Sequence, residues 1–329
     1  MKALVCESYG PIDSLKIKEY VIPSVGSGQV KIDVSFASVN FPDALIVQGL
    51  YQVKPPTPFV PGHELSGVVS EIGNDVRNVQ VGQRVVATPG VGGFAEHVVV
   101  DESKVIALPN SMTMEQGASL TLTYGTSLHA LQNCAELKKG ETLLILGASG
   151  GVGAAAIEIG KIMGAKVIAA ASSQDKLNFC KNLGADECIN YDSDDLKKRV
   201  AEITNGKGVD VVYDAVGGSY SETALRSLGW RGRYLVVGFA AGSIPKIPLN
   251  LVLLSERKIS GVFWGEWVRR NPQDHLKNMQ LLESWFTQGL IRPLVTISYP
   301  LDQAKEAINH LASRKAMGKV IIEINAKIV

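Results

Sequence analysis

The chain has 329 residues, enough for two domains, and its 46% hydrophobic and 20% charged content is ordinary for a globular protein. Its 33 Lys and Arg nearly balance 32 Asp and Glu, so the net charge of +1 gives no reason to expect a nucleic-acid or membrane-surface partner. The first ten residues are too interrupted for a targeting segment, and no apolar run reaches the roughly 18 to 20 residues of a membrane span. We therefore expect a cytoplasmic protein without a membrane partner.

Short strands separated by turn residues occupy the chain up to about residue 108. Glycine and proline punctuate them at regular spacing, which is typical of a barrel or sandwich-like unit. The runs are KALVCE, SLKIKEY, QVKIDVSFASV, HELSGVVSEIG, RVVA, AEHVVV and KVIAL.

Strands and helices alternate between residues 142 and 238, after a helical stretch that starts near residue 112. The strand-like segments are TLLILG, KVIAAA, ECIN, VDVVYDAV and RYLVVGF, and helix-like segments such as AAAIEIGKIMG and DKLNFCKNLG lie between them. This alternation predicts a doubly wound parallel sheet in an α/β domain.

The last 70 or so residues are too few to form a domain alone. They contain a strand (ISGVFW), two helices near 272–288 and 301–313, and a final strand (GKVIIEI). We expect this tail to fold back onto the N-terminal unit.

A glycine-rich turn, Gly147 to Gly153, joins the first strand of the alternating region to the helix that follows. In a dinucleotide site, Gly150 would let the backbone approach a pyrophosphate and Gly153 would let the helix pack on the sheet. The helix N-terminus would offer free N–H groups to the phosphates. An ordinary tight turn is the alternative, but the β-α-β context favours dinucleotide binding.

The end of the next strand distinguishes the two nicotinamide cofactors. An NAD site usually carries an acid there, whereas this chain has Ser172, Ser173 and Lys176. Hydroxyls and an ammonium group suit the 2′-phosphate of NADP(H), because charge-assisted hydrogen bonds to phosphate are strong. The alternative is that Ser173 caps a helix and Lys176 is solvated.

Several segments together resemble the medium-chain dehydrogenase/reductase superfamily, and specifically its zinc-free quinone oxidoreductases, the ζ-crystallin-like branch. They are SVNFPDALIVQGLYQVKPPTPFVPGHELSGVVSEIG, GASGGVG, AAASSQDK, GVDVVYDAVGG and GKVIIEI. The resemblance implies a GroES-like, β-rich catalytic domain from residues 1–122 and 264–329. It also implies a Rossmann domain at 123–263 that binds NADP, with the cofactor cleft between the two.

Zinc-dependent relatives carry a catalytic cysteine shortly before the G-H-E segment, but this chain has Asn40 near that place. There is no cysteine between Val85 and Leu108, and the four cysteines of the chain form no C-x-x-C pair. His63 and Glu64 alone do not complete the three-ligand site that catalytic zinc requires. We therefore expect a metal-independent protein in which His63 is structural or supports neighbouring site residues. The alternative is that Asp43 and Glu64 bind some other ion.

The resemblance also implies which residues hold the cofactor. Those near the nicotinamide are Asn40 and Thr126, those at the pyrophosphate are Ser149, Gly150, Gly151 and Val152, and those at the 2′-phosphate are Ser172, Lys176 and Tyr191. Those bordering the ribose and nicotinamide are Gly217, Gly238, Phe239, Ala240, Val262, Phe263 and Trp264, with Lys319 closing the site. Trp264 and Trp267 are equally compatible with a core or a dimer interface.

Tyr51 is the candidate hydrogen-bond donor to the substrate oxygen, with Asn40 as the second catalytic candidate. The alternative for Tyr51 is a half-buried packing role beside the prolines. A second tyrosine of several relatives corresponds here to Leu45, a departure from the family pattern.

These features predict NADPH-dependent reduction of a small-molecule quinone, because an electron-poor acceptor can be reduced by a well-oriented nicotinamide without a metal. One alternative is an enoyl or 2-alkenal reductase that acts on enones. Another is a crystallin-like protein that binds the cofactor with little turnover. By family analogy alone we expect a homodimer paired through the ISGVFW strand.

Overall fold

The computed structural model describes residues 1–326, which divide into two compact units. Unit 1 contains residues 1–122 together with the described residues from 293 onward, and unit 2 contains residues 123–292. No helix in the described chain is long and apolar enough to cross a membrane.

Unit 1 is built on antiparallel strands. A seven-stranded sheet has the order β14-β15-β3-β4-β5-β7, with β6 also paired to β3, and β1 and β2 form a separate pair within residues 1–326. The strands are β1 (Lys2–Val5), β2 (Lys16–Glu19), β3 (Gln29–Val39), β4 (Glu64–Ile72), β5 (Arg84–Ala87), β6 (His97–Asp101), β7 (Val105–Ala107), β14 (Val295–Pro300) and β15 (Lys319–Glu323). The N-terminal strands predicted from the sequence are confirmed.

The long strand β3 shows why this segment of unit 1 forms a sheet. Val30, Ile32 and Val34 alternate with polar residues and are completely buried, as the two-residue period of a strand requires. The C-terminal strand β15 pairs with the end of β3, with Val320 opposite Val39. This pairing brings the last described strand beside Asn40, which begins the next element.

Helices complete unit 1. They are α1 (Phe41–Val47), the start of α2 (Met114–Leu128) and α10 (Ala304–Ala312), with 3₁₀ turns at Ile12–Ser14, Glu102–Lys104 and Leu301–Gln303. Helix α1 is not among the elements expected from the sequence. The Asp43 carboxylate accepts a hydrogen bond of 2.7 Å from the N–H of Asn40, which satisfies a backbone donor at the start of this helix.

Unit 2 contains a six-stranded parallel sheet with the order β10-β9-β8-β11-β12-β13. Its strands are β8 (Thr142–Leu146), β9 (Lys166–Ala171), β10 (Glu187–Asn190), β11 (Val209–Asp214), β12 (Leu228–Val236) and β13 (Lys258–Gly261). The chain runs outward from β8 in one direction and then outward from β11 in the other. The doubly wound Rossmann sheet is thus confirmed, and its order reverses between β8 and β11, where such folds bind ligands.

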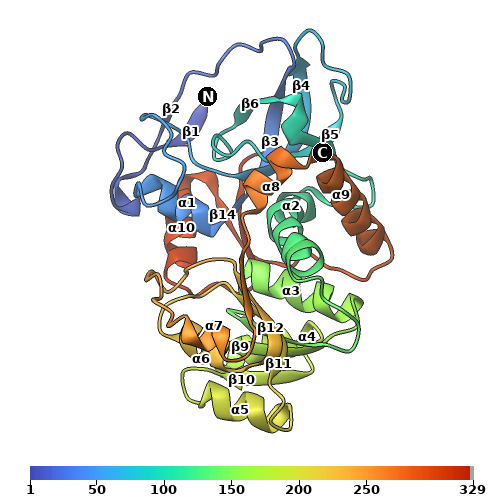
Figure 1. Ribbon diagram of the computed structural model, residues 1–329. Coiled ribbons are helices and arrows are strands. Elements are labelled where there is room, and N and C mark those ends of the chain that lie inside the picture. The colour runs from blue at the N-terminus through green and yellow to red at the C-terminus, as the bar shows by residue number, and fades with distance from the viewer. Residues whose placement is uncertain (327–329) are drawn as a thin grey trace. The chain divides into compact units, whose positions relative to one another are not determined.

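Helices cover both faces of this sheet (Figure 1). The helices of unit 2 are the end of α2, α3 (Gly151–Ile162), α4 (Gln174–Asn182), α5 (Leu196–Ile203), α6 (Tyr220–Arg226), α7 (Asn250–Leu253), α8 (Trp264–Arg270) and α9 (Pro272–Thr287), with a π-helix at His129–Cys134. Leu144 and Leu146 share one apolar core with α5, α6 and α7. On the opposite face, Gly160 of α3 packs directly over Leu143 and Val167.

Residues 264–292 belong to unit 2, which differs from the boundary expected after residue 263. The physical reason is their packing on α2 and the π-helix. The Trp264 indole lies so close to Gly125 that a Cβ there would be 2.9 Å from it. Asn278 of α9 also donates a hydrogen bond of 3.1 Å to the side-chain oxygen of Asn133.

Candidate active site

The glycine turn after β8 is held by its own backbone. Gly147 has a φ of +68°, and its carbonyl oxygen accepts a hydrogen bond of 3.0 Å from the N–H of Gly150. A Cβ added at Gly153 would lie only 2.3 Å from that same oxygen. The absence of a side chain at Gly153 therefore lets α3 begin directly against the turn.

The first turn of α3 is open to an anion. Its N-cap residue, Gly150, provides no side-chain cap, and a Cβ built there meets nothing nearer than 3.5 Å. Ser149 is buried in the turn, and Gly151 and Val152 are the first residues of the helix. The four residues predicted to hold the pyrophosphate thus lie together at a helix N-terminus, where N–H groups and the helix dipole favour phosphate.

At the end of β9 the structure brings together the residues predicted to hold the 2′-phosphate. Lys176 Nζ donates a hydrogen bond of 3.0 Å to Ser172 Oγ. Tyr191 lies next to them, because its N–H donates to the carbonyl of Ala171 at 3.1 Å. Ser173 caps α4 by accepting from the N–H of Lys176, so the capping alternative holds for Ser173 while Lys176 contacts Ser172.

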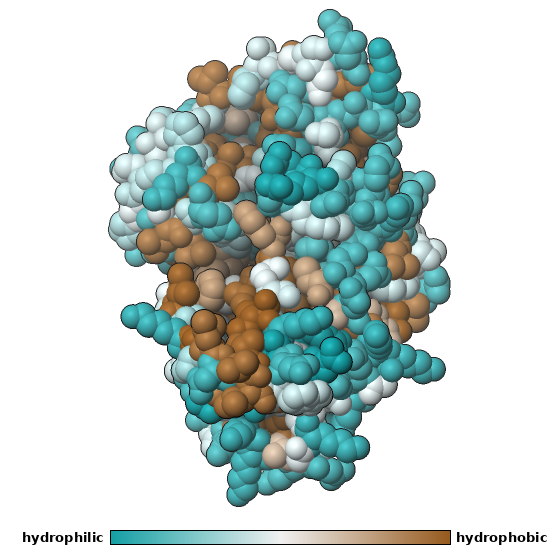
Figure 2. Space-filling view, viewed as in Figure 1, coloured by the Kyte–Doolittle hydropathy of each residue, from teal (hydrophilic) through white to brown (hydrophobic). Residues whose placement is uncertain are grey.

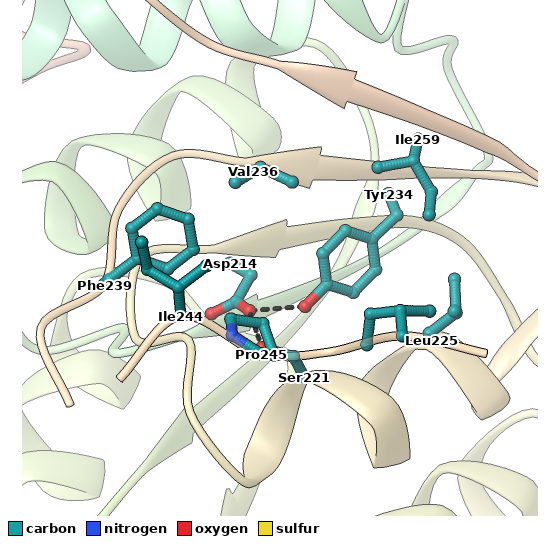
Figure 3. Close-up of a pocket in the computed structure, with 10 residues that line it drawn as sticks. Asp214, Ser221, Leu225, Tyr234, Val236, Phe239, Ile244, Pro245 and Ile259 are labelled. Carbon is teal, nitrogen blue, oxygen red and sulfur yellow. Dashed lines mark hydrogen bonds between the residues drawn. The ribbon is translucent and has the colours of Figure 1, made fainter. Parts of the chain in front are cut away.

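Asp214 shapes the turn after β11 (Figure 3). Its Oδ1 accepts hydrogen bonds of 2.8 Å from the N–H groups of Val216 and Gly217. Its Oδ2 accepts from Ser221 Oγ at 2.8 Å and from the hydroxyl of Tyr234, whose pKa is raised by burial and by this carboxylate. Beside this group is a cavity of about 140 Å³, walled mainly by the apolar side chains Leu225, Val236, Phe239, Ile244, Pro245, Ile247 and Ile259.

The predicted ribose-binding turns lie against each other. Gly217 has a φ of +71°, and a Cβ there would be 2.7 Å from the ring of Phe239. The N–H groups of Gly238 and Ala240 donate to the carbonyls of Asp214 and Ala215, both at 3.2 Å. The carboxyl ends of β11 and β12 therefore form one continuous backbone surface.

The three residues after β13, 262–264, differ in how exposed their side chains are. Val262 continues the strand by donating from its N–H to the carbonyl of Val236 at 2.9 Å. Phe263 is 50% exposed, whereas Trp264 is 9% exposed and packs on α2 one residue before Thr126. Among the described residues the Trp264 Nε1 has no hydrogen-bond partner. Its burial supports the core interpretation for this tryptophan.

Unit 1 contains the remaining predicted residues, and its center is Asn40. Lys319 Nζ donates to Asn40 Oδ1 at 2.7 Å, and Asn40 Nδ2 donates to Ser38 Oγ at 3.0 Å. Ser38 in turn donates to Glu64 Oε2 at 2.6 Å, and the Lys319 ammonium lies 3.7 Å from the same oxygen. Burial lowers the pKa of Lys319, while the Glu64 and Asp43 carboxylates raise it.

Tyr51 lies beside a second ionisable pair. His63 Nδ1 is 2.6 Å from Asp43 Oδ1, and the Tyr51 ring meets the His63 ring edge-on with centroids 5.8 Å apart. Burial and the Asp43 charge raise the pKa of Tyr51, which keeps it a neutral donor.

No cluster of three or more His, Cys, Asp or Glu side chains in the described chain has the geometry to hold a metal ion. His63 is engaged with Asp43, and the cation beside Glu64 is the Lys319 ammonium. The donor groups around Asn40 thus serve hydrogen bonds and internal ion pairs. We call this group the Asn40 cluster; it consists of Ser38, Asn40, Asp43, His63, Glu64 and Lys319.

Sequence reasoning missed Ser38 and Asp214, which support the predicted residues. Asp214 carried a usable signal, because an acid that ends a buried strand before Gly217 and Gly218 commonly satisfies the N–H groups of a tight turn. Ser38 carried none, since its contact depends on the pairing of β3 with β4. Asn40, Tyr51 and Lys319 belong to unit 1 and the other predicted residues to unit 2.

Two family models match the chain. The alcohol dehydrogenase GroES-like domain matches residues 26–110, and the zinc-binding dehydrogenase model matches residues 151–284. These matches fall on the antiparallel unit and the parallel-sheet unit respectively.

Curated relatives and solved structures cover nearly the whole chain. Quinone oxidoreductase-like protein 2 of Rattus norvegicus is 37% identical over 94% of this chain and 89% of its own length. A quinone oxidoreductase of Pseudomonas aeruginosa is 31% identical over 98% and 99%. The crystal structure of the Escherichia coli quinone oxidoreductase complexed with NADPH superposes with a TM-score of 0.94 at 28% identity, over 98% of this chain and 100% of that one.

The identity to the curated relatives, together with the two-unit fold, places the chain among oxidoreductases, and its Asn40 cluster lacks the donors of a catalytic zinc. The chain belongs to the zinc-free quinone oxidoreductase family of the medium-chain dehydrogenases and reductases.

Proposed function

We propose that this protein reduces quinones with NADPH and without a metal ion. The observation that carries the proposal is the Asn40 cluster, in which the Lys319 ammonium donates a hydrogen bond to the side-chain oxygen of Asn40. Beside it, the Tyr51 phenol is available as a neutral donor. The names of the relatives supply the acceptor class, because quinone oxidoreductases match over almost the full length.

The residues of unit 2 fit NADP(H). The uncapped start of α3 would hold the pyrophosphate through Ser149, Gly150, Gly151 and Val152. Ser172, Lys176 and Tyr191 would hold the 2′-phosphate, since β9 does not end on an acid, provided that Asp175 in the first turn of α4 points away. The turns at 217 and 238–240, with residues 262–264, would border the ribose and nicotinamide. The complexes of the Escherichia coli and mycobacterial relatives with NADPH support this cofactor.

When bound, NADPH supplies the hydride, and the chain supplies orientation and a proton donor. The Asn40 carboxamide is held at both ends, by Lys319 and by Ser38, so it would present a fixed edge to a bound nicotinamide. Tyr51 would donate its hydroxyl hydrogen bond to the acceptor oxygen as negative charge develops there. Thr126 and Lys319 would complete the contacts around the nicotinamide.

The charges of the Asn40 cluster support the proposal that the protein works without a metal ion. A buried ammonium already compensates Glu64, and His63 is paired with Asp43. A second cation in the same place would have to displace Lys319, which would leave that ammonium buried without its partners.

We further propose that the protein is a homodimer joined at the β13 edge. β13 pairs only with β12 within the described chain, so its outer backbone groups are available to another strand. Ile244, Leu249, Leu253 and Leu254 are each at least 70% exposed. Figure 2 shows an apolar patch where Figure 1 places α7 and β12. A patch of this kind commonly marks an interface.

The test is oxidation of NADPH by chelator-treated protein with p-benzoquinone, with a short enone, and with NADH replacing NADPH. We expect turnover with the quinone and NADPH and much slower turnover with NADH. Turnover with the enone alone would assign the protein to the alkenal reductases. Tight NADPH binding without turnover on either acceptor would favour a crystallin-like role.

A further inference from the structure

A buried carboxylate on α3 has no role in the site described above. Glu158 is 9% exposed, and its neighbours Ala155, Ala156, Ile157 and Ile159 are buried and apolar. A carboxylate in such surroundings is destabilising unless its oxygens are well satisfied. We therefore expect the Glu158 carboxylate to form hydrogen bonds that hold neighbouring segments of unit 2 in position.

Two segments that are far from Glu158 in sequence contact its carboxylate. The Tyr124 hydroxyl of α2 donates to Glu158 Oε2 at 2.5 Å. The N–H of Arg292, the last residue of unit 2, donates to both carboxylate oxygens at 3.2 and 3.3 Å. Burial raises the pKa of Glu158 to about 7, and the bonds from Tyr124 and Arg292 oppose that rise.

A second hydrogen bond joins α2 to α3, and it comes from Ser127, three residues after Tyr124 on α2. Ser127 Oγ donates to the carbonyl of Val152 at 2.8 Å and lies 2.9 Å from the Tyr213 hydroxyl. Val152 is in the first turn of α3, where the pyrophosphate is proposed to bind. Thr126, the proposed nicotinamide contact, lies on α2 between Tyr124 and Ser127, the two residues that form these hydrogen bonds.

The opposite side of α2 is fixed by packing. The Trp264 indole occupies the space where Gly125 lacks a side chain, and a Cβ there would be 2.9 Å from Trp264 Cζ2. The hydrogen bonds to α3 on one side and the Trp264 ring on the other therefore restrict movement of α2 along α3.

We propose that Glu158 and Tyr124 are positioning residues, which set α2 along α3 and so hold Thr126 at the nicotinamide while the first turn of α3 holds the pyrophosphate. This inference rests on the proposed function, because it takes NADP(H) as the ligand of unit 2. It predicts that Glu158 and Tyr124 strengthen binding of the nicotinamide end of the cofactor and do not change binding of the adenosine end.

Few other groups near Glu158 titrate at neutral pH. Tyr124 and Arg292 face it, and the pKa of Tyr124 is raised well above its usual value, so it stays neutral. On the π-helix beside α3, burial lowers the pKa of His129. Lys161, on the same helix as Glu158, is paired with Asp186 at 2.6 Å. A fluorescence transition near pH 7 is therefore expected from Glu158.

The experiment compares NADPH with 2′,5′-ADP, which has the adenosine and 2′-phosphate but no nicotinamide. Affinities are measured by calorimetry, and the nicotinamide environment by the fluorescence of bound NADPH across pH. The variants are Tyr124→Phe and Glu158→Gln. Glu141→Gln is the matched control, because it breaks the ion pair with Arg233 in unit 2 without touching α2 or α3.

We expect both variants to bind NADPH about tenfold more weakly, the effect of one hydrogen bond to a charged group. Their affinity for 2′,5′-ADP should equal that of the wild type. The wild-type fluorescence transition near pH 7 should move upward in Tyr124→Phe, because a bond that lowers the pKa is lost, and should vanish in Glu158→Gln. The Glu141→Gln control should match the wild type in every measurement.

Equal weakening of both ligands would overturn the proposal, because it would show a general structural role. Unchanged NADPH fluorescence in Tyr124→Phe would overturn it as well, and this variant keeps the test decisive if Glu158→Gln does not fold. Neither readout needs an acceptor. Wild-type protein that binds NADPH but reduces no quinone would contradict the proposed function while leaving this inference standing.

Discussion

Lys319 Nζ donates a hydrogen bond of 2.7 Å to Oδ1 of Asn40, and both side chains are almost completely buried. The ammonium group defines which end of the carboxamide is the oxygen, because it can only donate. It also lies 3.7 Å from Glu64, so one lysine both orients the amide and compensates a buried acid.

Replacing Lys319 by methionine should therefore destabilise the protein. Glu64 would be left buried without a cation, a change that costs about 3 kcal/mol. The double variant Lys319→Met with Glu64→Gln should recover much of this loss, since no uncompensated charge remains. Urea unfolding followed by circular dichroism measures both. A single-variant loss below about 1 kcal/mol would show that the ammonium does not compensate Glu64.

Alanine at two glycines of the β8–α3 turn should have different consequences. Gly153→Ala places a Cβ 2.3 Å from the Gly147 oxygen, so it should lower the unfolding temperature. Gly150→Ala meets nothing nearer than 3.5 Å and has a φ of −76° that alanine accepts, so it should fold normally. It should nevertheless weaken NADPH binding, because the methyl group would stand where the pyrophosphate approaches. Normal NADPH affinity in folded Gly150→Ala would place the pyrophosphate elsewhere.

The Rossmann sheet and its glycine turn could be predicted because their signals are local. Strand, glycines and helix follow one another within residues 142–162, and the central strands β8 and β9 are apolar runs. The Asn40 cluster could not be assembled in this way, since its contact with Lys319 spans 279 residues and depends on the pairing of β15 with β3. The unit assignment of α9 likewise depends on tertiary contacts, such as that of Asn278 with Asn133.

Substitution of Lys176 should change the affinity for NADPH without changing the affinity for NADH. Lys176→Met removes the ammonium that contacts Ser172, but it keeps the N–H through which Ser173 caps α4. Because hydrogen bonds to charged groups contribute about 1.5 to 3 kcal/mol, NADPH affinity should fall by about 10-fold to 100-fold. NADH affinity should not change. Fluorescence titration with both cofactors makes the comparison, and a parallel loss of NADH affinity would argue against a 2′-phosphate contact.

The buried carboxylate of Glu158 should also make the stability of the protein depend on pH. Its folded pKa of about 7 lies above the ordinary value of 4.5, so the folded state holds the proton more tightly. The associated stability is present below pH 4.5 and is lost as pH rises through 7, by roughly 3 kcal/mol. Thermal unfolding of wild type and Glu158→Gln between these pH values should show this slope as the difference in stability between the two proteins. Parallel curves would mean that Glu158 does not titrate there.

The Tyr51 hydroxyl should matter for turnover and not for cofactor binding. Tyr51→Phe keeps the ring contact with His63 and removes only the donor, so kcat with a quinone should fall by about a hundredfold at unchanged NADPH affinity. Since burial and Asp43 raise the pKa of Tyr51, any decline of the wild-type rate through loss of this proton should come at higher pH than for an ordinary tyrosine. Tyr299→Phe is the control in the same unit, because its hydroxyl contacts His310. Full activity in Tyr51→Phe would favour the packing role for this tyrosine and would require another donor to the acceptor oxygen.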